Sequence, residues 1–135
     1  MTTWLLKSEP DTYSWDDLVR DKTTVWDGVA NNAALIFLRT MKQGDEVLFY
    51  HSGGVKQIIG IAKITKEAYP DPKLDDPKRV VVEIGVVKPL TKPVSLAEVK
   101  AVPALKEMAL VRISRLSCQP VTAAERKVLE KLGVK

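Results

Sequence analysis

Cysteine and histidine are almost absent from this chain, which contains one of each, Cys118 and His51. A disulfide within the chain needs two cysteines, and a structural zinc site needs four ligands that are usually drawn from these two residue types. The sequence therefore excludes an internal disulfide and the usual structural zinc site. We expect no metal ion and no other cofactor.

Long apolar runs and the common enzyme motifs are also missing. No segment approaches the roughly 20 apolar residues of a membrane span, and Lys7 and Glu9 interrupt the N-terminal stretch where a signal peptide would be apolar. There is no phosphate-binding glycine loop, no dinucleotide fingerprint and no nucleophile elbow. We expect a soluble, cytoplasmic protein without membrane contact.

Size and charge indicate one globular domain with a basic C-terminal half. The 135 residues fit a single domain, 1–135, and 45% hydrophobic with 28% charged residues is near the globular average. Residues 1–68 carry 8 basic and 9 acidic side chains, whereas residues 69–135 carry 13 and 8. This excess is compatible with a nucleic-acid partner, although many proteins without one are equally basic. The oligomeric state is left open.

Residue patterns predict short strands mixed with helices. Strands are predicted at 2–7, 23–26, 46–50, 57–64, 79–87 and 110–115. Lys88-Pro89 is expected to end the fifth strand, and a helical turn over 106–111 is an alternative near the sixth. Helices are predicted after the N-cap Ser14, over 31–41, from 95 to 100, and after a capping box at 122–125.

These elements predict an α+β fold. The 31–41 helix is apolar around most of its circumference and is expected to be largely buried, while three prolines between 69 and 77 predict an irregular loop. The predicted elements do not follow the regular order of a strand, a helix and a second strand parallel to the first. A mixed or antiparallel β-barrel of five or six strands with helices packed around it is therefore expected.

Two segments contain candidate binding residues. Gly53-Gly54 closes a predicted hairpin that brings Tyr50, His51 and Ser52 together, although such polar groups often only cap the backbone. Gly28 leads into the predicted 31–41 helix, where unpaired amides at the helix start attract anions and hydrogen-bond acceptors. Simple capping by Asn31 is the alternative at this corner.

Several motifs resemble the EVE domain family, occur in the family's order and cover nearly the whole chain. They are Trp4-Leu5-Leu6-Lys7-Ser8-Glu9-Pro10, Trp26-Asp27-Gly28-Val29, Gly44-Asp45, Tyr50-His51-Ser52, Gly60-Ile61, Glu67-Ala68-Tyr69-Pro70-Asp71, Arg115-Leu116-Ser117 and Pro120-Val121-Thr122. The resemblance implies a PUA-like fold. It also implies a non-catalytic module that recognises a modified base, chiefly a modified cytosine in DNA such as 5-methylcytosine or 5-hydroxymethylcytosine.

Two positions depart from the family pattern. Ala30 stands where arginine usually follows Trp-x-Gly-Val, which removes a cation beside the expected pocket. Arg79 stands where a tryptophan usually begins the strand after the proline loop, which alters the pocket rim or a surface contact.

A reader of one base in a duplex must flip that nucleotide out and bind it in a pocket. Trp26 is the best stacking platform, since its indole offers the largest aromatic face, whereas Trp4 and Trp15 are assigned to packing. The predicted base-binding residues are Ser8, Trp26, Gly28, Asn31, Asn32, Tyr50, His51, Ser52 and Tyr69. The candidates for phosphate contacts are Lys7, Arg79, Arg112 and Arg115.

Two other functions are alternatives to DNA reading. An RNA-binding PUA-like domain would use the same pocket and the basic C-terminal half for modified or structured RNA. A small hydrolase would use His51 as general base for Ser8, Ser52 or Cys118. The His51 and Ser52 side chains point to opposite sides if both lie on a strand, so that pair has poor geometry for catalysis.

Overall fold

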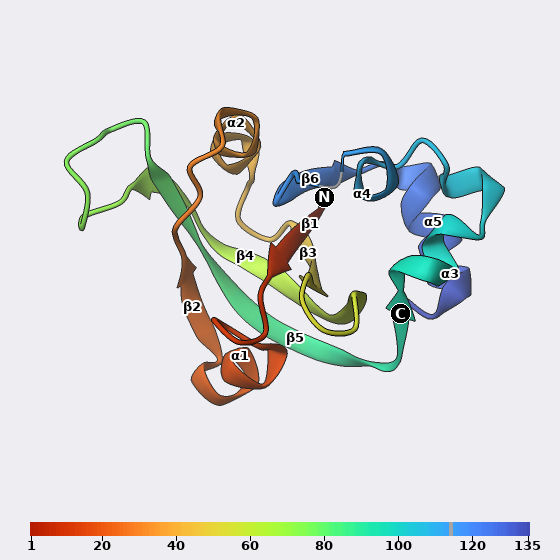
Figure 1. The fold of residues 1–135 in the computed structure, drawn as a ribbon. Coiled ribbons are helices and arrows are strands. Elements are labelled where there is room, and N and C mark those ends of the chain that lie inside the picture. Colours follow the sequence, from red (N-terminus) through yellow and green to blue (C-terminus); the bar gives the residue numbers. More distant parts are fainter. Residues whose placement is uncertain (114) are drawn as a thin grey trace.

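Six strands form a single mixed sheet in the computed structural model, which describes residues 1–113 and 115–135 (Figure 1). The strands are β1 (Thr3–Ser8), β2 (Thr23–Trp26), β3 (Glu46–His51), β4 (Gln57–Pro70), β5 (Val80–Ser95) and β6 (Cys118–Val121). Their order is β2-β5-β4-β3-β1-β6, with β1 and β3 parallel and the other neighbours antiparallel. The α+β class is confirmed, but β2 and β6 are edges, so the sheet is not closed into a barrel.

Within the described residues, five α-helices and one 3₁₀ turn pack around this sheet. They are α1 (Trp15–Asp21), α2 (Asn32–Thr40), α3 (Leu96–Lys100), η1 (Pro103–Leu105), α4 (Ala109–Arg112) and α5 (Ala123–Leu132). In Figure 1, α1 and α2 lie on the left, and the three C-terminal helices gather on the right. Helices α1, α3 and α5 each begin with a capping box, at Ser14, Ser95 and Thr122, because one hydroxyl and one carboxylate satisfy amides at the helix start.

The sheet separates two hydrophobic cores because successive strand residues point to opposite faces. Trp4 and Leu6 of β1 join the core under α1 and α2, together with Phe49 of β3. Leu5 of β1 and Leu48 of β3 join the second core under the C-terminal helices. Trp4 and Trp15 are 3% and 5% exposed, which confirms their assignment to packing.

Two adjacent carboxylates anchor the turn that leads into β3. Asp45 is 5% exposed and accepts hydrogen bonds from the Trp4 indole N–H at 2.9 Å, the Lys42 amide at 2.9 Å and the Thr2 amide at 3.1 Å. The next residue, Glu46, forms a two-point ion pair with Arg126 of α5. These contacts hold the predicted hairpin of β3 and β4 to both β1 and α5.

The predicted end of the fifth strand is wrong, since β5 continues through Pro89 and Pro93 to Ser95. Proline lacks an amide donor, but the pairing of β4 with β5 shifts between Ile58 and Gly60 and again between Ile61 and Ala62, close to Pro89. Irregular positions of this kind tolerate a missing donor. The proline-rich loop is confirmed from Asp71 onward, whereas Tyr69 and Pro70 still belong to β4. The loop projects beyond the sheet between β4 and β5 in Figure 1.

The predicted strand at 110–115 is also wrong. Its first part belongs to α4, where the amides of Val111 and Arg112 donate to the Met108 carbonyl, and Ser114 lies outside the described residues. A helical turn places its apolar residues almost as a short strand would, so the pattern could not separate the two. The sequence reading missed β6 altogether.

The helix predicted over 31–41 is confirmed as α2, with Asn31 as its N-cap, but it is not largely buried. Only one side packs on the sheet, through Ala34, Leu35 and Leu38, while Ile36 on the outer side is 59% exposed. No helix in the described part of the chain is long and apolar enough to span a membrane.

Candidate functional site

A cavity of about 680 Å³ opens where β1 ends, beside β2 and the segment that follows it. Three parts of the chain meet there because Pro10 ends β1 and the chain turns back toward α1. The lining residues are Lys7, Ser8, Glu9, Thr12, Tyr13, Thr24, Val25, Trp26, Asp27, Gly28, Val29, Ala30, Lys73 and Ser117. Pockets that bind small ligands in proteins typically have volumes of about 300–1,000 Å³.

Trp26 forms an aromatic wall of this cavity at the end of β2. It is 8% exposed and packs edge-on against Phe49, with 5.6 Å between ring centroids. Trp15 packs against the same Phe49 at 5.5 Å but does not line the cavity. The backbone then turns at Gly28, whose φ of 78° lies in the left-handed region that favours glycine. The indole is therefore fixed by core packing rather than free to rotate.

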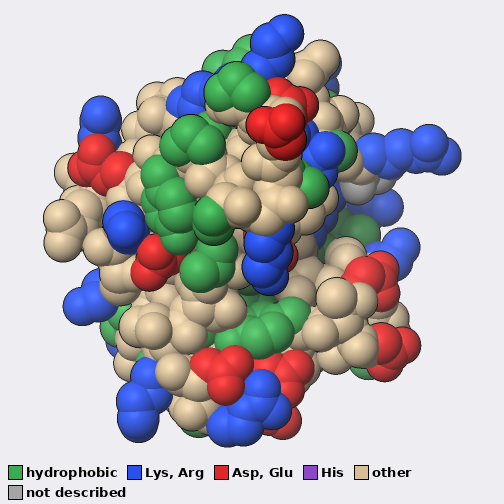
Figure 2. Space-filling view, turned by 90° about the vertical axis from the view of Figure 1, so that its left-hand side faces the viewer, with side chains coloured by type: hydrophobic (Ala, Val, Ile, Leu, Met, Phe, Trp, Pro, Cys, Tyr) green, Lys and Arg blue, Asp and Glu red, His purple; other side chains and the backbone are tan. Residues whose placement is uncertain are grey.

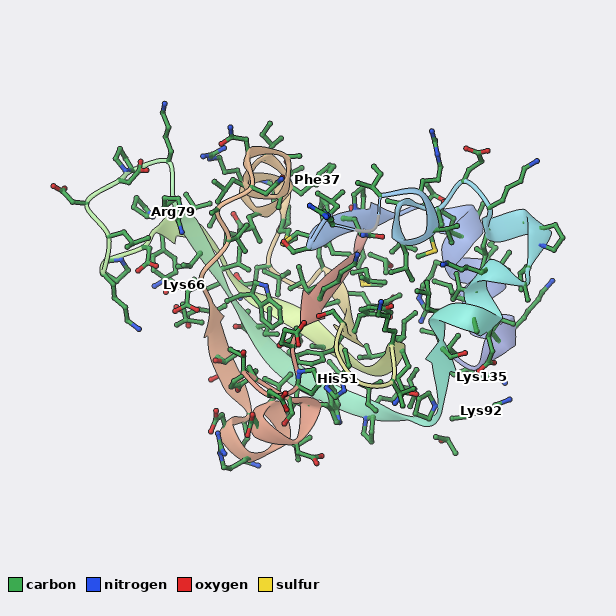
Figure 3. All side chains as sticks on the ribbon, viewed as in Figure 1. Phe37, His51, Lys66, Arg79, Lys92 and Lys135 are labelled. Atoms are coloured by element: carbon green, nitrogen blue, oxygen red, sulfur yellow. The ribbon has the colours of Figure 1, made fainter. Side chains whose placement is uncertain are left out.

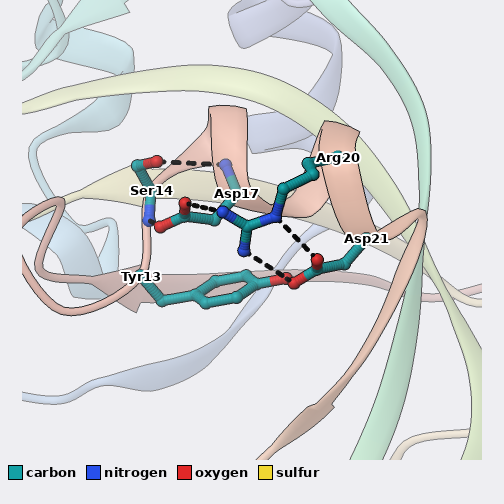
Figure 4. Close-up of polar contacts among 5 residues, drawn as sticks. All are labelled: Tyr13, Ser14, Asp17, Arg20 and Asp21. Atoms are coloured by element: carbon teal, nitrogen blue, oxygen red, sulfur yellow. Dashed lines mark hydrogen bonds and ion pairs between the residues drawn. The ribbon is translucent and has the colours of Figure 1, made fainter.

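Another part of the cavity lining is fixed by a hydrogen-bond network around Tyr13 (Figure 4). The Tyr13 hydroxyl donates to Asp21 at 2.9 Å, and Arg20 donates to both Asp21 and Asp17. Burial, together with the hydrogen bond to Asp21, raises the pKa of Tyr13 despite an opposing contact with Thr24. Ser8, 8% exposed, donates its hydroxyl to the Tyr13 carbonyl, so its oxygen can only accept from a ligand.

The rim of the cavity carries both signs of charge. Lys7 and Lys73 face Glu9 and Asp27 among the lining residues, and the Lys73 ammonium lies 3.9 Å from the Asp27 carboxylate. Figure 2 shows the side of the molecule that carries the proline loop, where basic, acidic and hydrophobic side chains are interspersed. The mouth therefore offers separate hydrogen-bond donors and acceptors rather than a uniformly basic surface.

Four predicted residues meet at the cavity, namely Lys7, Ser8, Trp26 and Gly28. Tyr13, Asp27, Lys73 and Glu9 also line the cavity but are not among the residues predicted from the sequence. Glu9 and Asp27 are neighbours in the sequence of predicted site residues, and this adjacency could have identified them as cavity residues. Nothing local in the sequence indicated that Tyr13 and Lys73 would reach the same cavity.

The hairpin loop contributes support rather than cavity lining. The His51 Nε2 atom accepts a hydrogen bond from the Trp15 amide at the start of α1, at 3.0 Å (Figure 3). The Ser52 hydroxyl donates to Glu9 at 3.3 Å, so His51 and Ser52 engage different partners. Tyr50 and Ser52 line a second, smaller pocket of about 80 Å³ next to Lys7. The loop thus fixes the start of α1 and also Glu9, which lines the cavity.

The hydrogen bond at His51 predicts how stability depends on pH. Burial lowers the pKa of His51 even though Asp16 opposes the shift, and protonation of Nε2 would remove the acceptor. The unfolded chain takes up this proton at about pH 6.5, so the free energy of unfolding should fall as the pH drops from there to the lowered pKa. An NMR titration of the single histidine should give a midpoint below 6.5.

A His51→Gln variant provides the control for this titration. Glutamine keeps an acceptor but does not titrate, so the variant should lose the dependence of unfolding free energy on pH in that window. A histidine midpoint at or above 6.5 in the wild type would contradict the prediction.

Asn31, Asn32 and Tyr69 do not line the cavity, so their predicted contacts with a base stay predictions. The Asn31 side chain accepts from the Ala34 amide at 3.1 Å as the cap of α2, and Asn32 is exposed. The Tyr69 hydroxyl donates to Glu83 at 2.7 Å, which, with burial, raises its pKa to about 12. Tyr69 therefore joins β4 to β5 in the structure.

The predicted phosphate contacts are dispersed. Arg79 donates from Nε to the Val29 carbonyl at 3.1 Å, so the residue that departs from the family pattern braces the cavity rim. Arg112 forms an ion pair with Glu107 at 3.1 Å, and Arg115 is exposed after α4. Only Lys7 reaches the cavity, and the other predicted phosphate contacts remain untested. No group of three or more His, Cys, Asp or Glu side chains in residues 1–113 and 115–135 is placed to hold a metal ion.

Comparison with known proteins gives consistent matches over the whole chain. The EVE domain family model matches residues 2–132. Human thymocyte nuclear protein 1 is 38% identical over 156 aligned residues, which cover 90% of this chain and 69% of that protein.

Solved structures match equally well. The NMR structure of Rpa0253 from Rhodopseudomonas palustris is 48% identical, with a TM-score of 0.93 over 98% of this chain and 93% of that one. The crystal structure of human THYN1 in complex with 5-methylcytosine-containing DNA is 37% identical, with a TM-score of 0.91 over 98% of this chain and 97% of that one.

Proposed function

Because the chain belongs to the EVE domain family, we propose that it binds DNA and holds one modified cytosine, flipped out of the helix, in the Trp26 cavity. The human relative of similar fold was solved with 5-methylcytosine-containing DNA. The observation that carries the proposal is the cavity itself, which a rigid indole lines together with hydrogen-bonding groups at a strand end.

Stacking on Trp26 supplies the main gain in binding energy. Extruding a nucleotide costs a few kcal/mol, and stacking a base on an aromatic ring returns about 1–3 kcal/mol. The edge-on packing with Phe49 keeps the indole in place before the ligand arrives, so little side-chain entropy is lost on binding. Trp26 should therefore decide whether the flipped state is populated.

Different groups on the rim would recognise the cytosine ring and its modification. The Glu9 and Asp27 carboxylates can accept from the exocyclic amine of cytosine, as can the Ser8 oxygen. Val29 and Ala30 supply apolar contacts for a methyl group. Burying one methyl-sized group contributes about 0.8 kcal/mol, roughly fourfold in affinity, so a larger preference requires the base to be fully enclosed.

We further propose that the chain acts by binding alone. A hydrolase using His51 would need that ring to accept a proton from a nearby nucleophile. In the structure His51 Nε2 is occupied by the Trp15 amide, and the Ser52 hydroxyl is directed to Glu9. Cys118 is buried, and burial raises its pKa to about 12, so its thiol is a poor nucleophile.

The test compares two tryptophans that pack on the same ring. Fluorescence anisotropy would measure binding of oligonucleotides that differ at one cytosine, either unmodified, 5-methyl or 5-hydroxymethyl, in DNA and in RNA at two salt concentrations. We expect one modified DNA to bind about tenfold tighter than unmodified DNA, a difference of about 1.4 kcal/mol. Trp26→Leu should abolish this preference, because only non-specific contacts to the phosphates then remain.

Trp15→Leu is the matched control, since Trp15 is equally buried against Phe49 but lies outside the cavity. Both variants should lose stability, yet the control should keep the preference for the modified base. Equal binding of all oligonucleotides by the wild type, with a steep dependence on salt, would show a backbone binder and refute the proposal. A preference for the modified base that is seen only in RNA would refute DNA reading and support the alternative function, an RNA-binding PUA-like domain.

A further inference from the structure

Glu9 lies where the hairpin loop between β3 and β4 meets the main cavity. It lines that cavity together with Trp26, and it remains exposed to a ligand. Its backbone is fixed, because the Glu9 carbonyl accepts from the amides of Thr12 at 3.0 Å and Tyr13 at 2.8 Å. The Glu9 side chain therefore starts from a defined backbone position beside the proposed base site.

Two residues of the hairpin loop limit where the Glu9 carboxylate can lie. The Ser52 hydroxyl donates to Glu9 Oε1 at 3.3 Å. A Cβ atom on Gly53 would lie 2.5 Å from Glu9 Oε2, which is much closer than two non-bonded atoms can approach. Glycine at position 53 therefore leaves space for the carboxylate, and the Ser52 hydroxyl holds it there.

The two carboxylates that line the cavity differ in their partners. The Lys73 ammonium lies 3.9 Å from the Asp27 carboxylate and offsets part of its negative charge. Glu9 is hydrogen-bonded instead to the neutral hydroxyl of Ser52. A carboxylate has about four acceptor positions, so this one bond leaves Glu9 able to accept from a ligand. Glu9 is therefore the stronger acceptor for a charge-assisted hydrogen bond from a base.

An acceptor is needed because a methyl group alone does not identify cytosine. Thymine carries the same methyl group at ring position 5 as 5-methylcytosine, and it is an ordinary base of DNA. The two bases differ at position 4, where cytosine has an amine that donates and thymine has an oxygen that accepts. A carboxylate facing position 4 attracts the amine and repels the oxygen, so it favours one base and disfavours the other.

We propose that Glu9 selects cytosine over thymine in the Trp26 cavity, and that Ser52 and Gly53 are positioning residues for its carboxylate. The inference rests on the proposed function, because the base must occupy that cavity. Neither Ser52 nor Gly53 lines the cavity, so both act on the base only through Glu9.

The test offers the protein two DNA duplexes in which the probed base, 5-methylcytosine or thymine, faces an abasic site. Neither base is paired there, so the duplexes differ only in the base that enters the cavity. Fluorescence anisotropy should show that the wild type binds the 5-methylcytosine duplex about tenfold tighter or more. Glu9→Gln should reduce this preference to less than about threefold, because an amide can donate or accept and so can pair with either base.

Glu130→Gln is the matched control for the Glu9 variant. It removes the same charge from an exposed position on α5, outside the cavity. It should keep the wild-type preference for 5-methylcytosine over thymine.

Gly53→Ala tests the positioning role without altering a residue that lines the cavity. The new Cβ should displace the flexible end of Glu9, so the preference should fall about threefold or more while urea unfolding stays close to that of the wild type. Ser52→Ala should lower the preference less, and Ser52→Thr, which keeps the hydroxyl, should retain it. In the double variant Glu9→Gln/Gly53→Ala, the alanine should change nothing further, because its effect passes through Glu9.

The outcomes separate selection by Glu9 from the proposed function. If Trp26→Leu weakens binding of both duplexes but the wild type binds them equally, selection by Glu9 is refuted while the base cavity stands. Loss of the preference in Asp27→Asn but not in Glu9→Gln would assign the selection to Asp27 and overturn the inference. A further effect of Gly53→Ala in the double variant would refute the positioning role. If Trp26→Leu changes binding of neither duplex, the proposed function fails, and selection by Glu9 fails with it.

Discussion

Replacing Asp45 by alanine is expected to lower the free energy of unfolding by about 3 kcal/mol, because a charged acceptor of several buried hydrogen bonds is lost. The carboxylate is 5% exposed and accepts from the Trp4 indole, the Lys42 amide and the Thr2 amide. Without it, the indole N–H of Trp4 stays in the core with no acceptor. Urea unfolding followed by tryptophan fluorescence would measure the loss.

Asp75→Ala is the control for this variant, since Asp75 is exposed in the proline loop and should change stability by less than about 0.5 kcal/mol. A similar small effect of Asp45→Ala would show that water replaces these hydrogen bonds.

The same carboxylate should make the fold sensitive to acid. Burial alone would raise the pKa of Asp45, but hydrogen bonds from Trp4, Lys42 and Thr2 hold it below the usual 3.8. A lowered pKa in the folded state contributes stability that is fully present above pH 3.8 and is lost as the pH falls through the lowered value. Below pH 4, stability should therefore fall more steeply in the wild type than in Asp45→Ala.

Arg126→Met is expected to cost about 2–3 kcal/mol, because a mostly buried ion pair loses one partner. The Arg126 and Glu46 side chains are 20% and 15% exposed, and Arg126 also donates to the Val134 carbonyl at 2.7 Å. Methionine keeps the apolar contacts of the arginine stem, so the loss reflects the guanidinium group. Thermal and urea unfolding of Arg126→Met, Glu46→Gln and the double variant would give the coupling energy.

Arg20→Met is a stringent control for the ion pair. Arg20 also contacts two carboxylates, Asp21 at 2.9 Å and Asp17 at 3.1 Å, but its side chain is 67% exposed. Exposed pairs contribute about 0–1 kcal/mol, so this variant should unfold almost as the wild type does. Equal losses for the two arginine variants would mean that burial does not distinguish them.

Local signals in the sequence predicted much of the fold. Ser14, Ser95 and Thr122 each sit three residues before a carboxylate, and each begins a helix as expected. Glycines mark the β3–β4 hairpin in the same direct way. These features succeed because capping and turn geometry depend on only a few neighbouring residues.

Features that depend on distant partners were not predictable. Strand β5 passes Pro89 because its pairing with β4 shifts there, and nothing near Pro89 shows the shift. At the site, Trp26 and Ser8 follow from the motifs, whereas Tyr13 reaches the cavity through the turn at Pro10 and a hydrogen bond to Asp21. The sequence therefore identified parts of the site but not Tyr13.

The two cores on opposite faces of one sheet have a consequence for local opening. One core is covered by α1 and α2, and the other is covered by the C-terminal helices. These two covers have few contacts with each other, so they can unfold as separate units while the sheet stays folded. Amide hydrogens in each cover then exchange at rates set by the stability of the core beneath that cover. The amide hydrogens of β3 and β4 exchange only when the whole domain unfolds. A base bound beside Trp26 would protect the first cover.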